Sequence, residues 1–419
     1  MRQIATTIAL ASITLAATVS ATAANTPQPL YRVTLLSPPA AGTSARGTSI
    51  NDWGLVAGSF KRASGERHAA VWLDSRAWDL GTLGTADSLK STVLWPVKNH
   101  LGFVSGISQT DTPDSLQEAW SCGAFLSNPT HRICQGFLWA WGVMLPLVSL
   151  GTGDHNSFAV GTNDRGQTAG WAEVDEHGSD CTGTQVLGFK PVIWESGRTQ
   201  PRELPLLGAD TAGAATALNN RGQVVGISGE CGTAVGGVSA KHAVLWDNGV
   251  VIELKNPNGA GYWNTPNMIN ERGDVVGFAG VPGDVAGAYT PPFLWTRKQG
   301  FRILSMLDGD VGGSAQSINN HGQIVGFAYT DPNAAAHALF WSDGAVAAID
   351  LNKLIEPVAG LVLNVANDIN DRGEITGIAT SANGPVAFVA TPIGMSTPAA
   401  NMACADASAC GPVSVLIHL

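Results

Sequence analysis

The chain has 419 residues, 44% of them hydrophobic, which is enough for a large core. Glycine is enriched at 50 residues and charged residues are depleted at 13%, a profile that favours many short strands and tight turns over surface-charged helices. The formal net charge is −10 and no Lys/Arg cluster reverses it locally, so we expect no nucleic-acid partner.

The first segment, residues 1–23, has the features of an export signal. Arg2 precedes an apolar stretch rich in Ala, Ile, Leu and Thr, and Ala21-Thr22-Ala23 forms a small-residue cleavage site. A transmembrane anchor is the alternative, but Ser and Thr dilute the apolar run and no basic flank follows it. We therefore expect a cleaved signal peptide and an extracellular or periplasmic protein with no membrane span.

A short pattern, Asn-x-x-Gly-x-x-x-Gly, occurs seven times at intervals of 48 to 64 residues. Its asparagines are Asn51, Asn99, Asn163, Asn219, Asn270, Asn319 and Asn370. An Asn side chain can accept from a backbone N–H two residues on, and Gly takes the positive φ that ends a turn. The pattern predicts hairpin turns. Seven metal or ligand sites are the alternative, but the residue after each Asn varies, whereas a hard cation needs several fixed oxygens.

Each turn is followed by an apolar block that usually ends in Trp, and then by a Leu-rich block. The block-ending residues are Trp72, Trp139, Trp194, Trp246, Trp295 and Trp341, with Ala390 in the seventh copy. We expect these Trp side chains to pack between repeats; a ligand platform is the alternative. Every unit thus reads as four short strands, so the sequence predicts an all-β fold, a seven-bladed β-propeller of four-stranded blades.

The two ends of the repeat region indicate a closed ring. A Leu-rich strand at 31–36 precedes the first turn, and no such strand follows the last apolar block at 386–390. We expect 31–36 to complete the seventh blade as its outer strand, which removes the exposed sheet edges of an open solenoid, the alternative architecture. The propeller would then span 31–393, followed by a C-terminal tail at 394–419.

The repeated blocks resemble those of the bacterial extracellular HAF repeat proteins. The matching segments are "HAAVW" from His68, "HAVLW" from His242, "HALFW" from His337, "LGTLG" at 80–84 and the seven turns. The resemblance covers roughly 46–390 and implies export and a repeat fold, with no particular chemistry. The three His residues begin the same strand in different blades, so we expect strand-edge hydrogen bonds and neither a metal site nor a cofactor.

The large insertions, 107–135, 171–189 and 227–240, fall in connections that lie opposite the Asn turns, where a rigid scaffold usually carries recognition loops. An even number of cysteines in an exported chain favours disulfides. The predicted pairs are Cys122 with Cys134, Cys181 with Cys231, and Cys404 with Cys410. A zinc site is the alternative, but no Cys-x-x-Cys spacing supports it.

Aromatic, His and acidic residues of these connections form the predicted binding set. It comprises Trp120, His131, Asp154, His155, Asp210, Tyr262, Trp263, Asp308 and Asp310. Trp and Tyr beside carboxylates suit a glycan or a peptide, although ordinary loop residues are the alternative. The segment "DGDVGG" at 308–313 resembles the start of a calcium loop but lacks its later ligands.

The functional hypothesis is a secreted, monomeric binding or scaffold module that recognises a glycan or a protein through one propeller face. One alternative is an extracellular hydrolase or lyase with carboxylates or His155 at the channel mouth, which requires acidic or His side chains from different blades to converge. Another is a purely structural envelope protein. No nucleophile-elbow, zinc-protease or phosphate-loop motif is present, so we assign no catalytic residue.

Overall fold

The computed structural model describes residues 30–394, without 75, 119–121, 127–130, 179, 182–184, 235–240, 258, 260–263, 285 and 343–346. The expected signal peptide and the predicted Cys404–Cys410 pair lie outside the described residues.

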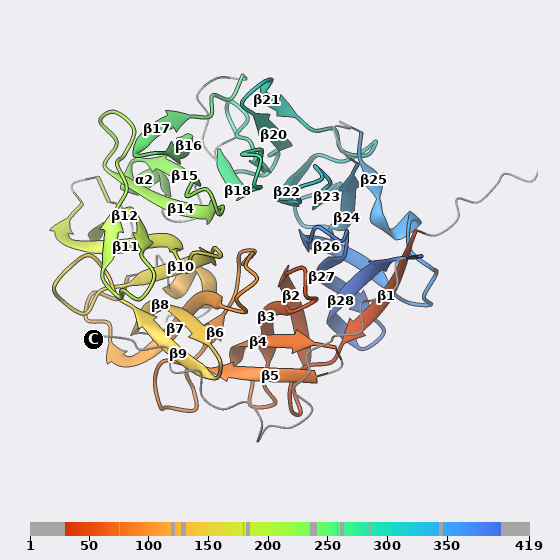
Figure 1. The fold of residues 1–419 in the computed structure, drawn as a ribbon, viewed down its shortest axis with the longest axis horizontal. Helices are drawn as coiled ribbons and strands as arrows, with labels where there is room; N and C mark the ends of the chain where they lie inside the picture. The colour runs from red at the N-terminus through yellow and green to blue at the C-terminus, as the bar shows by residue number, and fades with distance from the viewer. Residues whose placement is uncertain are drawn as a thin grey trace, which may run out of the picture.

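Seven four-stranded antiparallel sheets are arranged in a ring around a central axis (Figure 1), which confirms the predicted seven-bladed propeller. Blades 1 to 3 are β2 (Ser44–Ile50), β3 (Val56–Lys61), β4 (Arg67–Leu73) and β5 (Arg76–Gly81); β6 (Ser91–Thr92), β7 (Val104–Pro113), β8 (Arg132–Ala140) and β9 (Val143–Leu147); and β10 (Ser157–Thr162), β11 (Thr168–His177), β12 (Leu187–Trp194) and β13 (Pro201–Glu203).

Blades 4 to 7 follow the same order from the axis outward. They are β14 (Ala212–Leu218), β15 (Val224–Gly229), β16 (His242–Asp247) and β17 (Val250–Glu253); β18 (Thr265–Ile269), β19 (Val275–Phe278), β20 (Pro292–Thr296) and β21 (Gly300–Ile303); β22 (Gly312–Ile318), β23 (Ile324–Tyr329), β24 (His337–Trp341) and β25 (Ile349–Asp350); and β26 (Val362–Ile369), β27 (Ile375–Ser381), β28 (Gly384–Pro392) and β1 (Tyr31–Leu36). The short helices are α1 (Ala124–Leu126), α2 (Cys231–Ala234) and η2 (Leu351–Lys353).

Ring closure uses the N-terminal strand as predicted. β1 pairs antiparallel with β28, from Tyr31 opposite Pro392 to Leu36 opposite Ala387. In Figure 1 the red β1 lies beside the blue β28, so the two ends of the described chain share blade 7. Because both segments belong to one sheet, the ring cannot open without breaking a strand pairing.

The inner strand of every blade except blade 2 carries a β-bulge against its neighbour, and the second glycine of the repeat lies opposite it. A Cβ on Gly226 would collide with the backbone oxygen of Ala214. The bulge also turns a polar side chain toward the next blade, as where Thr216 Oγ1 donates to the oxygen of Pro266 at 2.5 Å. Close strand packing therefore requires glycine here, as it does at Gly377, where a Cβ would meet the oxygen of Val365.

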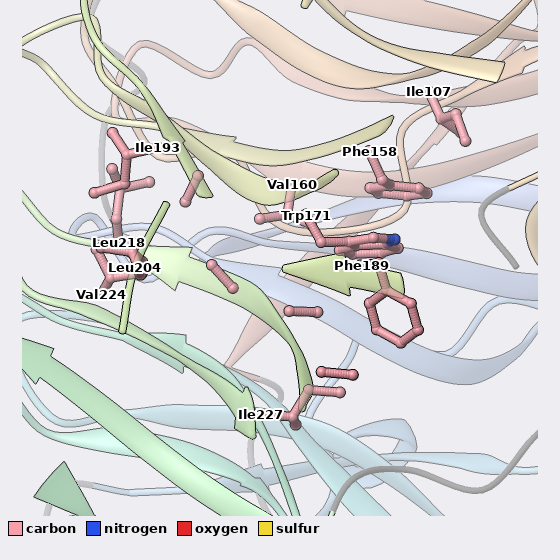
Figure 2. Close-up of a cluster of buried hydrophobic side chains, with 14 of the residues drawn as sticks. Ile107, Phe158, Val160, Trp171, Phe189, Ile193, Leu204, Leu218, Val224 and Ile227 are labelled. Atoms are coloured by element: carbon pink, nitrogen blue, oxygen red, sulfur yellow. The ribbon is translucent and has the colours of Figure 1, made fainter. Parts of the chain in front are cut away.

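The hydrophobic core lies between neighbouring blades. In the largest cluster, which spans blades 2 to 4, Phe158 stacks on Trp171 with ring centroids 4.3 Å apart (Figure 2). Four of the repeat tryptophans are buried and donate from Nε1 to a backbone oxygen in the connection that enters their blade: Trp72, Trp194, Trp246 and Trp341. These contacts agree with the predicted packing between blades.

The strand order defines two faces of the ring. Six inner strands end directly before their Asn turns, and β6 leads to its turn through residues 93–98; these turns define what we call the Asn-turn face. The connections from second to third strand, and from outer strand to the next blade, lie on the opposite side, which we call the insertion face. All the large insertions belong to the insertion face.

Candidate functional site

The seven repeat asparagines form a continuous ring of hydrogen bonds on the Asn-turn face. Each Oδ1 accepts from the backbone N–H groups two and four residues on, which confirms the predicted turns. In six blades Nδ2 also donates to the backbone oxygen of the next repeat asparagine. Asn99 instead donates to the oxygen of Thr162 at 3.2 Å. Since both ends of each amide are used internally, this ring is structural.

The residues directly after the asparagines form a second ring. They are Asp52, His100, Asp164, Asn220, Glu271, Asn320 and Asp371. In six blades the backbone N–H of this residue donates to the side chain of its counterpart in the next blade, as from Glu271 to Asn320 Oδ1 at 2.8 Å.

His100 follows this pattern with its backbone N–H, but its side chain makes different contacts. Its Nε2 and Nδ1 lie 2.9 Å from Asp52 and Asp164, so the imidazole bridges two carboxylates. The hydrogen bond with Asp164 is the largest influence on the His100 pKa, which is raised above the usual value.

A cavity of about 120 Å³ lies at the centre of the Asn-turn face, between this ring and the inner strand ends. Lys98 is one of the residues that line it: its Nζ donates to the oxygen of Ile369 at 2.6 Å and lies 3.1 Å from the buried carboxylate of Asp368. The described residues contain no group of three or more His, Cys, Asp or Glu placed to hold a metal. Because its polar rim is engaged in contacts between blades, we interpret this cavity as part of ring closure.

On the insertion face, the described members of the predicted binding set lie in separate connections. His155 Nε2 is 2.8 Å from Asp175 Oδ1. The hydrogen bond from His155 lowers the Asp175 pKa below its usual value, and further bonds from Thr152 act in the same direction. His131 and Asp154 are exposed.

The two predicted aspartates before β14 and β22 are engaged within their own blades. Asp210 accepts from Ser228 Oγ at 2.6 Å, and Asp310 accepts from the backbone N–H of Leu307 at 2.9 Å. Asp308 is exposed. Within the described part of the chain, no hydrogen bond or ion pair joins two members of the predicted set. Trp120, Tyr262 and Trp263 lie outside the described residues.

The three histidines of the HAF-like strands each contact an acidic residue of the insertion face. His68 Nδ1 lies 2.8 Å from Asp79, His242 Nδ1 lies 3.0 Å from Glu253, and His337 Nε2 lies 3.2 Å from Asp310. The recurrence in blades 1, 4 and 6 confirms strand-edge hydrogen bonding as the role of these histidines.

A pocket of about 290 Å³ opens on the insertion face between blades 4 and 5; we call it the blade 4/5 pocket. Its polar lining is Lys241, His242, Glu253, Lys255, Asn256 and Asn264. Two amides shape its wall, since Asn256 Nδ2 donates to Asn264 Oδ1 at 2.9 Å and Asn264 Nδ2 donates to the oxygen of Lys241 at 3.1 Å. Asp210, a member of the predicted set, lies 4.0 Å from Nε2 of the lining residue His242.

The sequence prediction did not name the polar lining of this pocket. The available signal was the connection between β17 and β18, which places Asn256 and Asn264 on either side of Tyr262 and Trp263. The two lysines and the amides were missed because their convergence depends on two blades being neighbours.

Among the described residues of the insertion face, two acidic side chains from different blades converge. Glu118, in the insertion of blade 2, and Glu173, in β11 of blade 3, both lie 3.2 Å from Gln185 Nε2. Burial, and then the charge of Glu118, raise the Glu173 pKa well above its usual value. Both side chains are buried, and Glu118 Oε1 also accepts from the backbone N–H of Val186 at 2.7 Å. The pair therefore attaches the insertion to blade 3 and does not face a substrate.

The described insertions are cross-linked as predicted, with disulfides between Cys122 and Cys134 and between Cys181 and Cys231. The first closes a loop inside the blade 2 insertion, and the second joins the insertions of blades 3 and 4. Both therefore restrict the conformations of the insertion face.

The chain matches no protein-family model and no curated protein. Among solved structures it is similar to a puromycin-hydrolyzing peptidase of Mycobacterium tuberculosis, with 9% identity, a TM-score of 0.48, and coverage of 86% of this chain and 55% of that chain. It is also similar to the extracellular domain of a putative one-component system of B. thetaiotaomicron, with 8% identity, a TM-score of 0.44, and coverage of 85% and 39%. The chain thus spans about half of those chains or less, and we draw no functional argument from them.

None of the helices within the described residues is long and apolar enough to cross a membrane.

Proposed function

We propose that the protein is an exported binding module that recognises a glycan through the blade 4/5 pocket on its insertion face. The observation that carries this proposal is the pocket itself, a concave site of about 290 Å³ lined by amide, lysine and carboxylate groups between two rigid blades. Export through residues 1–23 and membership of the HAF repeat proteins belong to the same proposal.

The chemistry of the lining supports a polyhydroxylated ligand. No hydrogen bond or ion pair is found for the ammonium groups of Lys241 and Lys255 within the described residues, and both can donate to hydroxyl or carboxylate oxygens. Tyr262 and Trp263 of the predicted binding set lie in sequence between Gly259 and Asn264, and from the sequence alone we propose them as the aromatic residues that contact a sugar ring.

We favour binding over hydrolysis because the histidine in the pocket has a structural counterpart in other blades. His242 contacts Glu253 as His68 contacts Asp79, and the blade 1 pair is not part of this pocket. An acid–His contact that repeats around the ring is accounted for by the fold, so it does not indicate a catalytic base.

A glycan array with the purified mature protein, followed by calorimetry on the best ligand, tests the proposal. We expect binding that is lost in Trp263→Ala and weakened in Lys255→Ala. The matched control is Trp53→Ala, which removes a half-exposed Trp from the Asn-turn face and should leave affinity unchanged. Binding that survives Trp263→Ala and Lys255→Ala together would move the site elsewhere, and the absence of any glycan ligand would reject the proposed ligand class.

A further inference from the structure

An apolar strip lies on the outer hairpin of blade 2, on the other side of the molecule from the blade 4/5 pocket. Trp141 in the β8–β9 turn is 76% exposed, and Val143 and Leu145 of β9 are 57% and 43% exposed. Side chains two residues apart point to the same side of a strand, so Val143 and Leu145 form one continuous surface with the neighbouring turn. No charged residue occurs between Ala140 and Leu147.

The backbone at Trp141 is unusual for such a large residue. Trp141 and Gly142 have φ values of 53° and 89°, the left-handed pair required by a two-residue hairpin turn. Blade 4 makes the same turn with Asn248 and Gly249, at 52° and 80°. Asn tolerates this region, whereas a bulky side chain there is strained. No ring contact or hydrogen bond of the Trp141 indole is found among the described residues.

Apart from the expected signal peptide, the sequence contains one apolar segment outside the predicted propeller span, "VSVLIHL" at 413–419. In an extended chain Val413, Val415, Ile417 and Leu419 fall on one side, which gives an uncharged surface with the same two-residue spacing as Val143 and Leu145. We propose that residues 413–419 of the same chain cover the apolar strip.

The end of the described chain is placed for this contact. Gly394 lies two residues after Pro392, which pairs with Tyr31 at the Asn-turn face, and the Trp141 turn belongs to the same face. Val413 lies 19 residues after Gly394, and that length of chain reaches about 60 Å when extended. That reach exceeds the width of about 50 Å expected for a domain of this size, and only blade 1 lies between blade 7 and blade 2, so the segment is long enough to reach the strip.

The contact involves the side-chain surface of β9 more than its edge. Pro146 has no N–H, and it occupies a position from which an outer strand would otherwise offer a donor to an added strand. Apolar side chains are therefore the main source of affinity, and each buried one is removed from water on docking.

Photo-cross-linking in the full chain tests the proposal. The photoreactive residue p-benzoylphenylalanine replaces Val143, and mass spectrometry maps the linked peptides. Val250, the equivalent outer-strand position in blade 4 and similarly exposed, receives the same substitution as a matched control. We expect a link within one chain from position 143 to 413–419, no such link from position 250, and loss of the link in Val415→Asp with Ile417→Asp.

Three results would overturn the proposal. Links between two chains that increase with protein concentration would make a second copy the occupant. Links to other parts of the same chain would exclude the tail from the strip. No protein link at all would show an uncovered strip, and circular dichroism of each substituted chain confirms that it is folded.

Discussion

The side-chain amide of Asn370 donates to the backbone oxygen of Asn51 at 3.0 Å and thereby joins the last blade to the first. The same Asn370 accepts from the N–H groups of Arg372 and Glu374. One side chain therefore holds its own turn and closes the ring. A repeat asparagine in an open array would have no partner at this end.

Asn370→Ala should lower the free energy of unfolding by about 2–4 kcal/mol, because it removes several buried hydrogen bonds and leaves backbone groups without partners. Urea unfolding followed by tryptophan fluorescence measures this difference. Asn383→Ala, at an exposed hairpin position in the same blade, is the control and should change stability little. Equal effects of the two substitutions would contradict the role of Asn370 in closure.

His100 should make ring stability depend on pH. Its pKa is raised in the folded state, so its contribution is fully present below the unfolded value of about 6.5 and is lost as the pH rises through the folded value. We expect the urea midpoint of the wild-type protein to fall as the pH rises above about 6.5, and His100→Asn to reduce this fall, since Asn does not titrate.

The control for this prediction is His321→Asn, in the turn of blade 6, where the His side chain is exposed. It should retain the wild-type pH dependence. If His100→Asn and His321→Asn flatten the profile equally, the carboxylate bridge is not its source.

The free energy of unfolding should also depend on pH through the buried Glu173. Its folded pKa is raised, so the stability contribution is greatest below the unfolded value of about 4.3 and declines as the pH rises toward the folded value. Glu173→Gln cannot ionise, and its stability relative to the wild type should therefore increase with pH. Urea unfolding at several pH values measures the difference, with exposed Glu203→Gln as the control. A constant difference across the range would contradict this account.

Lys98→Met should cost about 3 kcal/mol, because it leaves the fully buried carboxylate of Asp368 without its cationic partner. The double variant with Asp368→Asn should lose less than the sum of the two single variants, since the unpaired charge is then absent. Thermal and urea unfolding measure the stabilities of the single and double variants. Lys61→Met, at an exposed strand end, is the control. Additive effects would show that Lys98 and Asp368 act independently.

The seven repeats made most of the fold predictable. The spacing of the Asn turns and Trp blocks defines four strands per unit, and the missing outer strand of the last unit identifies 31–36 as its replacement, paired as β1 with β28. The two disulfides were predictable because their cysteines lie in insertions of the same blade or of neighbouring blades. These features depend on hydrogen bonds between residues close in sequence and on the order of the repeats, and both can be identified from the sequence.

The candidate site was far less predictable. Of the nine predicted residues, those in the described part of the chain are distributed over blades 2, 3, 4 and 6, and no hydrogen bond or ion pair joins two of them. The blade 4/5 pocket instead depends on where Lys241 and Asn264 meet across two blades. Side chains far apart along the chain converge only after the ring has closed.

For the turn asparagines, too, the sequence determined one part of the role and the tertiary structure decided the other. Sequence alone determined that each Asn holds a hairpin, because its partners lie two and four residues away. Only the tertiary structure decided that its Nδ2 reaches the next blade, that His100 bridges two carboxylates, and that Glu173 lies against a second acid. Those contacts join residues separated by about one repeat or more, and their distances are determined by how the blades pack.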